Sequence, residues 1–278
     1  DDATLLGKEI PMTTTDNYWY VNAVDSENTK IRYYFINSVT LAKGWQTIDG
    51  KRYYFSTNAQ DGTLGQLCLG EYKIGNSYYY FEPEDTTNLG VMLANAWRQD
   101  SNTLNWYYYN ASGVRMSGWQ TINGSRYYFD PATGIKQTGI LQIGTTKYLL
   151  GADGILQKGY YVLDGISDDD NGTYFANNSG VLQYGWQKID GLYRFFDFNT
   201  GKEATSTIDG DYFATIGEYK YYLVNGTTMA TGFRDINGAR YYFEPQKGES
   251  YGRMKKSEFF NVGINTYYAD ENGVLQKG

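Results

Sequence analysis

The chain has 278 residues with a formal net charge of −7, 30 Tyr, 33 Gly, a single Cys and no His. Clustered Lys and Arg are what nucleic acids and anionic membranes bind, so this charge argues against both partners. Without an imidazole the chain cannot be a Ser-His-Asp or Cys-His hydrolase, and no apolar run approaches the roughly 20 residues that a membrane-inserted helix needs.

Residues 1–43 contain the least regular of a series of aromatic runs, at Tyr18-Trp19-Tyr20 and Tyr33-Tyr34-Phe35. The end units of a repeat array commonly differ from the internal ones because they cap its core. We therefore expect one elongated repeat domain over 1–278, with irregular or capping units in 1–43 and hairpin repeats in 44–278.

Residues 44–55 read Gly-Trp-Gln-Thr-Ile-Asp-Gly-Lys-Arg-Tyr-Tyr-Phe. An Asp-Gly pair between two short β-forming runs predicts a hairpin with a type I′ turn, because both central residues of that turn need positive φ. The expected strands are Trp45–Ile48 and Lys51–Phe55.

The same pattern returns three more times, which makes chance an inadequate explanation. The further copies are 118–129, 185–196 and 232–243. Looser aromatic runs stand between the copies at intervals of about 20 to 28 residues, which is the period of a repeat array. Abundant Gly and Tyr with four Pro favour short strands and tight turns. The sequence therefore predicts an all-β fold, a β-solenoid of repeated β-hairpins.

Alternation along the strands assigns the side chains of this hairpin to two faces. One face holds Gln46, Ile48, Lys51, Tyr53 and Phe55, and the other holds the remaining strand residues, Trp45, Thr47, Arg52 and Tyr54. Since a lone hairpin is marginal in water, one face must pack on neighbouring hairpins.

Between hairpins, tails such as 154–159, 180–183 and 273–278 predict short connecting strands whose Ile, Val or Leu fills the core. Larger loops that begin with Glu-Pro follow Phe81 and Phe243, and we expect specificity to vary there. Cys68 is expected to be a small buried hydrophobe. Ser167-Asp168-Asp169-Asp170-Asn171-Gly172 is interpreted as a solvated turn, so no metal site and no cofactor are expected.

Gln46, Gln120 and Gln187 recur beside aromatic residues. An amide offers both a donor and an acceptor to a sugar hydroxyl, whereas a purely structural strand would accept Thr or Val at this position. The alternative is that the aromatic residues only fill a thin core.

Residues 44–55 resemble the cell-wall-binding repeat family, which includes choline-binding modules, glucan-binding domains of glucansucrases and receptor-binding repeats of large clostridial toxins. The resemblance implies a β-solenoid that binds choline or carbohydrate in grooves between hairpins, without catalysis.

Choline-type repeats carry Trp at the first aromatic position of the second strand, where this chain has Tyr53, Tyr127 and Tyr241. This difference favours the glucan and toxin branches. Carried over by position, the expected carbohydrate-binding residues are Gln46, Lys51, Tyr53, Gln120, Tyr127, Gln187 and Tyr241. The third copy has Leu192 and Arg194 where Lys51 and Tyr53 stand, which argues against a site there.

The resulting hypothesis is a non-catalytic module of a secreted or cell-surface bacterial protein that binds polysaccharide, with α-glucan as the first candidate. An attached catalytic or toxin domain is a further expected partner. The alternatives are a choline or teichoic-acid cell-wall anchor and a purely structural or adhesive stalk.

Overall fold

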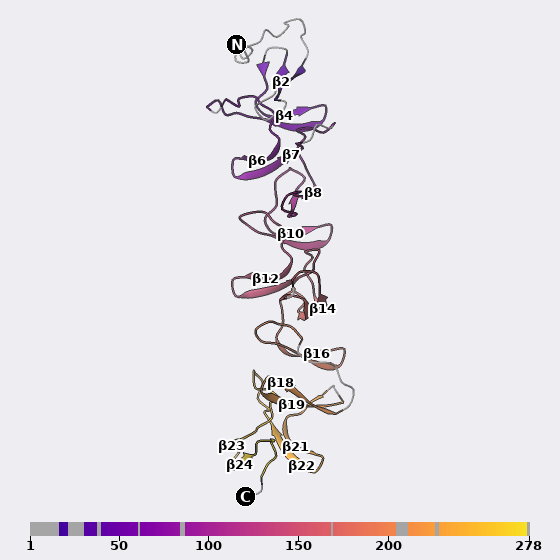
Figure 1. The fold of residues 1–278 in the computed structure, drawn as a ribbon, viewed down its shortest axis with the longest axis vertical. Coiled ribbons are helices and arrows are strands. Elements are labelled where there is room, and N and C mark those ends of the chain that lie inside the picture. Colours follow the sequence, from indigo (N-terminus) through magenta and orange to yellow (C-terminus); the bar gives the residue numbers. More distant parts are fainter. Residues whose placement is uncertain are drawn as a thin grey trace. The chain divides into compact units, whose positions relative to one another are not determined.

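The computed structural model describes residues 17–21, 31–37, 40–60, 62–83, 87–167, 169–203, 211–225 and 228–276. Within these ranges the chain consists of strands, turns and irregular segments without a helix (Figure 1), which confirms the predicted all-β class. Accordingly, no helix in this part of the chain is long and apolar enough to cross a membrane. Most of the expected capping region, 1–43, lies outside the described residues.

Two compact units divide the chain. Unit 1 comprises residues 1–121 and 128–136, and unit 2 comprises residues 122–127 and 137–278. Each unit is described by itself. A single domain over 1–278 therefore stays a prediction.

Unit 1 is a succession of antiparallel hairpins, the first extended by a third strand. The pairs are β1 (Tyr18–Val21) with β2 (Arg32–Ile36), which also pairs with β3 (Thr40–Leu41), β4 (Gly44–Ile48) with β5 (Lys51–Phe55), β6 (Gly70–Ile74) with β7 (Ser77–Phe81), and β8 (Ala96–Gln99) with β9 (Trp106–Tyr109). The next two-stranded sheet, β10 (Gly118–Ile122) with β11 (Ser125–Phe129), contains residues of both units.

Unit 2 continues the same architecture. Its pairs are β12 (Gly139–Ile143) with β13 (Thr146–Leu150), β14 (Gly159–Leu163) with β15 (Gly172–Ala176), β16 (Gly185–Ile189) with β17 (Leu192–Phe196), β18 (Tyr212–Ile216) with β19 (Tyr219–Val224), which also pairs with β20 (Thr228–Met229), β21 (Gly232–Ile236) with β22 (Ala239–Phe243), and β23 (Glu258–Val262) with β24 (Asn265–Ala269).

The predicted turns and register are confirmed in the hairpin at 44–55. Asp49 and Gly50 have φ of 50° and 75°, as a type I′ turn requires. The Cα pairs include Trp45 with Tyr54 and Thr47 with Arg52, so the two faces are those expected from alternation. The Asn-Gly and Asp-Gly turns of the other three copies also have positive φ at both residues.

Connecting segments join each hairpin to the preceding one. The amide of Leu67 donates to the carbonyl of Arg32 in the previous hairpin (2.8 Å), while the amide of Cys68 donates to Tyr54 in its own hairpin (2.9 Å). The same alternation occurs in unit 2. The amide of Leu275 donates to the carbonyl of Arg240 in the previous hairpin, and the amide of Gln276 donates to the carbonyl of Tyr268 in its own hairpin. This backbone ladder is what makes each unit a β-solenoid. The tails predicted as short connecting strands form isolated β-bridges instead, through residues such as Leu156, Leu182 and Leu275.

Both faces of a hairpin contribute to a thin core. Ile48, Tyr53 and Phe55 from one face pack with Leu67 in one cluster. Tyr54 from the other face packs with Cys68 and Phe81 in a second cluster, which confirms the expected burial of the cysteine. Burial raises the pKa of the Cys68 thiol to about 11.

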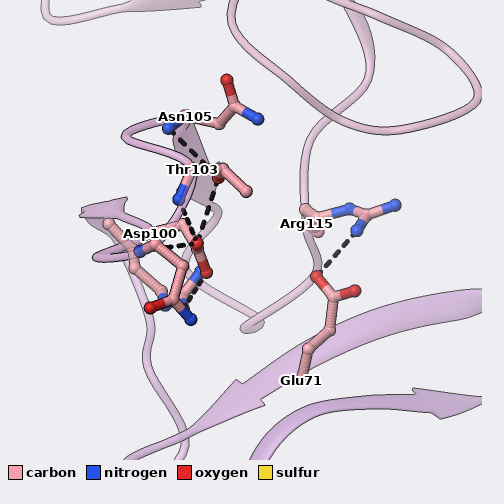
Figure 2. A network of polar contacts seen from close by, with 7 residues as sticks. Glu71, Asp100, Thr103, Asn105 and Arg115 are labelled. Atoms are coloured by element: carbon pink, nitrogen blue, oxygen red, sulfur yellow. Dashed lines mark hydrogen bonds and ion pairs between the residues drawn. The ribbon is translucent and has the colours of Figure 1, made fainter.

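A polar loop connects the two strands of the β8–β9 hairpin. Figure 2 shows the loop after β8, where one carboxylate oxygen of Asp100 accepts bonds from the amide and the hydroxyl of Thr103, both 3.0 Å away. Arg98 donates to the other oxygen at 2.9 Å. These bonds lower the pKa of Asp100 to about 2, with the Thr103 amide as the largest cause. The figure also shows the ion pair of Arg115 with Glu71 (2.7 Å), which ties a connecting segment to β6.

Candidate carbohydrate-binding grooves

A groove of about 660 Å³ lies in unit 2, against the last two described hairpins. We call it the C-terminal groove and define it by its lining residues, Phe233, Arg240, Phe259, Thr266, Tyr267, Tyr268, Leu275 and Gln276. Its volume falls in the range of about 300 to 1,000 Å³ that small-ligand sites occupy. Strands β21 to β24 and the connecting segment after β24 supply all of its lining residues.

Aromatic rings form the apolar part of this groove. Phe233 stands edge-on to Tyr267 at a centroid distance of 5.0 Å, and Phe259 lies 4.7 Å from its cross-strand partner Tyr268. Phe259 is 74% exposed and Tyr268 37% exposed. In the earlier hairpin of unit 1, the ring at the position of Phe259, Trp45, packs on Tyr79. Phe259 is exposed, whereas Trp45 is half-buried.

Polar side chains stand among these rings. The Thr266 hydroxyl donates to the Asn261 side chain (2.7 Å), and the Gln276 amide nitrogen donates to an oxygen of Asp270 (2.7 Å). Both residues are fixed by these bonds and still carry acceptor oxygens. Arg240 adds a guanidinium with its CZ atom 5.0 Å from the ring centre of Phe233.

A second groove of about 500 Å³ lies in the same unit, and we call it the loop-lined groove. Its lining residues are Tyr184, Gly185, Trp186, Tyr193, Phe198, Lys247, Gly248, Glu249 and Tyr251. The residues from 247 on belong to the larger loop after β22, so this loop reaches residues beside an earlier hairpin. Its position is consistent with the expectation that the Glu-Pro loops vary specificity.

The three predicted glutamines share a structural contact. Each side-chain amide donates to the carbonyl of the residue three positions earlier, just before the glycine that opens the strand. The bonds are Gln46 to Lys43 (3.1 Å), Gln120 to Ser117 (2.7 Å) and Gln187 to Tyr184 (2.9 Å). All three glutamines are half-buried. Neither Thr nor Val could donate such a bond from a side-chain amide, so the fold itself gives a reason for Gln here.

Other predicted residues also take part in the fold. The Lys51 ammonium donates to the Thr87 carbonyl (3.1 Å) and to the Asn88 side chain (3.0 Å). Tyr53 is only 7% exposed and packs edge-on against Trp19 at 5.3 Å, so it offers little ring surface to a sugar.

Tyr127 and Tyr241 are half-buried, and Tyr241 packs against Phe213 at 5.5 Å. In the third copy, Arg194 is bound to Glu203 (2.8 Å) and to the Tyr160 hydroxyl (2.9 Å). None of the seven residues predicted from sequence lines either groove, and their role in binding stays a prediction.

Most groove residues come from the other face of the hairpins. Phe233 and Arg240 stand at the positions of Trp45 and Arg52, and Trp186 stands at the position of Trp45. Sequence alternation identified this face, but the recurring Gln directed attention to the opposite one. The sequence signal for this face is an aromatic residue at the second position of the first strand together with a polar residue at the second position of the second strand. Phe233 and Arg240 are such a pair.

No group of three or more His, Cys, Asp or Glu side chains in the described ranges could hold a metal ion. Asp168, in the Asp-rich turn at 167–172, lies outside those ranges.

Comparisons with known proteins agree with this architecture. The family model described as a putative cell wall binding repeat matches residues 43–58 and 117–132. Glucosyltransferase-S of Streptococcus mutans is 31% identical over 260 residues, covering 86% of this chain and 17% of that protein. Toxin A of Clostridium novyi is 28% identical over 148 residues, covering 49% of this chain and 6% of the toxin.

The fold is similar to the structure of CbpJ from Streptococcus pneumoniae, with a TM-score of 0.55, 21% identity and coverage of 93% of this chain and 94% of CbpJ. At this identity the similarity concerns the fold alone. The resemblance to cell-wall-binding repeats, and to the glucosyltransferase and toxin branches among them, is thus confirmed. The chain spans less than a fifth of the length of glucosyltransferase-S and of toxin A.

Proposed function

We propose that this chain, with its putative cell wall binding repeats, is a non-catalytic module that holds polysaccharide in the grooves of its solenoid, with α-glucan as the first candidate. The observation that carries the proposal is the C-terminal groove, where exposed aromatic rings and hydrogen-bonding side chains line one cavity of about 660 Å³. The similarity to glucosyltransferase-S, whose name states transfer of glucosyl groups, supports glucan as the ligand class.

The chemistry of the groove suits a pyranose. One face of such a ring carries mainly C–H groups, which can pack on Phe259 or Tyr268, while its hydroxyls both donate and accept hydrogen bonds. Thr266, Gln276 and Arg240 supply partners of both kinds. A mixture of apolar walls and a few polar groups is the usual composition of a ligand site.

A binding role without catalysis agrees with the charges in the grooves. Glycoside hydrolysis usually employs two carboxylates on either side of the scissile bond. Among the described residues, the lining of the C-terminal groove includes no carboxylate, and that of the loop-lined groove includes one, Glu249. We propose that any catalytic or toxic activity belongs to another part of the protein, and that the protein is secreted or displayed on the bacterial surface.

A cell-wall anchor that binds choline is the second candidate, because ring clusters such as Trp45 with Tyr54 and Tyr79 resemble the sites that aromatic residues form for ammonium groups. Arg52 already lies over Trp45, however, with its CZ atom 4.1 Å from the ring centre. A structural stalk is the third candidate, favoured by the burial of residues such as Tyr53.

Retention on insoluble α-glucan tests the proposal. We expect Phe259→Ala and Tyr268→Ala each to lower retention about three-fold or more, since a packing contact with one exposed aromatic ring contributes on the order of 1 kcal/mol. The matched control is Ile264→Ala, which alters a fully exposed apolar residue in the turn of the same hairpin, outside the groove. Equal retention of all three variants and the unaltered chain would count against the C-terminal groove. Circular dichroism checks that each variant is folded.

A further inference from the structure

A guanidinium covers an aromatic ring at the same position of two hairpins, one in each unit. Arg52 lies over Trp45 with 4.1 Å between CZ and the ring centre, and Arg240 lies over Phe233 with 5.0 Å. The register explains the recurrence: each Arg stands diagonally across the hairpin from the ring, two pairs closer to the turn and so on the same face. A cation within about 6 Å of a ring face is attracted by the ring quadrupole. These rings therefore already have a cationic partner.

In the C-terminal groove this internal cation also sets the charge. Arg240 is the one charged residue among the described lining residues. Arg240 forms an ion pair with Asp235, with 3.7 Å between Nε and Oδ1. The side chain of Arg240 is 59% exposed and that of Asp235 is 74% exposed. An exposed ion pair of this kind contributes little, so Asp235 does not hold Arg240 away from Phe233. A ligand cation that entered the groove would meet a like charge and a ring face already covered.

We propose that Arg240 determines the specificity of the C-terminal groove by excluding ligands with ammonium groups and admitting uncharged or anionic glycans. This inference rests on the proposed function for the identity of the glycan, but the exclusion of cations follows from Arg240 and Phe233 alone. The loop-lined groove differs, because Lys247 and Glu249 give it charges of both signs.

The chain provides a matched control for Arg240. Arg234 lies on the same hairpin and is also exposed, but it pairs with Tyr241 and so stands on the opposite face, outside the groove. Arg240→Gln and Arg234→Gln therefore change the net charge equally, and only the first uncovers Phe233. Arg240→Lys keeps a cation in place. The backbone carbonyl of Arg240, which accepts a bond from Leu275 (2.7 Å), is present in every variant.

The first experiment uses tetramethylammonium, which needs no glycan site, and follows the ring-proton shifts of Phe233 and Tyr267 by NMR. Removing the competing cation should raise the affinity about two- to five-fold in Arg240→Gln, the range expected for an exposed cation–ring contact. Arg240→Lys and Arg234→Gln should behave like the unaltered chain. Equal gains in Arg240→Gln and Arg234→Gln, or no gain in either, would overturn the exclusion of cations.

The second experiment compares dextran, carboxymethyl-dextran and diethylaminoethyl-dextran of equal length at physiological ionic strength. Relative to the unaltered chain, we expect Arg240→Gln, but not Arg234→Gln, to shift its binding from dextran towards the cationic polymer. If no dextran is bound while tetramethylammonium responds as described, the proposed function fails and the role of Arg240 stands. If dextran is bound but its charge never matters, the role of Arg240 fails.

Discussion

Gln120 donates a hydrogen bond from Nε2 to the carbonyl oxygen of Ser117 at 2.7 Å, across the glycine that opens β10. Gly118 between them has a φ of 66°, a left-handed conformation that favours glycine. The amide thus holds the chain at the sharp change of direction where it enters the strand. The same contact recurs at Gln46 and Gln187, so it is a feature of the repeat.

Gln120→Ala is therefore expected to lower the free energy of unfolding by about 1 kcal/mol, the net contribution of a typical hydrogen bond. Retention on α-glucan should change little. Urea unfolding of this variant and of Thr121→Ala, which alters the exposed neighbour, measures the effect. A Gln120→Ala variant of unchanged stability that had lost retention would instead assign the glutamine to ligand binding.

A side chain at Gly90 is expected to destabilise the fold. It has a φ of 71°, and a Cβ atom built there would lie 2.5 Å from Cδ2 of Leu67, the core residue of the preceding connecting segment. Gly90→Ala combines backbone strain of about 1 to 2 kcal/mol with overpacking of about 1 to 3 kcal/mol. Gly75→Ala, with a φ of 60° and no atom within 4 Å, should show only the strain. Similar unfolding midpoints for the two variants would contradict this contact.

Acid should weaken the loop after β8 in a defined pH range. The folded state lowers the pKa of Asp100 to about 2, through the Thr103 amide first and Arg98 next, against about 3.9 in an unfolded chain. A carboxylate with a lowered pKa contributes stability that is present above about pH 4 and is lost as the pH falls towards 2. Asp100→Asn keeps an acceptor oxygen but does not titrate. Its unfolding midpoint should depend less on pH between 4 and 2, and an unchanged dependence would exclude Asp100 as a contributor.

Local rules predicted the hairpins well because their determinants are close in sequence. Asp49-Gly50 and its three counterparts fix the turn, and period-two alternation then fixes which residues share a face. Which face of a hairpin is exposed was harder to predict from the sequence than the turn and the register. Whether Tyr53 or Trp45 meets solvent depends on Leu67 and Trp19, which reach the hairpin from other segments. The exposure of Phe259 and Tyr268 likewise depends on packing between segments, which no local sequence pattern records.

Useful affinity is expected to come from several grooves on one polymer. Each groove is shallow compared with an enclosed pocket, so millimolar to high micromolar binding per site is reasonable, roughly 4 to 6 kcal/mol. Two weak sites that engage one long glucan raise the overall avidity by about 10² to 10⁴ without any new contact. Short oligosaccharides cannot span two sites and should bind weakly.

This expectation can be measured with one variant in each groove. Tyr268→Ala alters the C-terminal groove and Phe198→Ala alters the loop-lined groove, where the Phe198 ring is 45% exposed. Each change alone should lower retention on insoluble glucan modestly, because the other groove still holds the polymer. The double variant should lose far more than either single variant, while in each single variant the affinity of the unaltered groove for a short oligosaccharide stays the same. If the double variant, still folded by circular dichroism, retained polymer as well as either single variant, the two grooves would not be acting together on one chain.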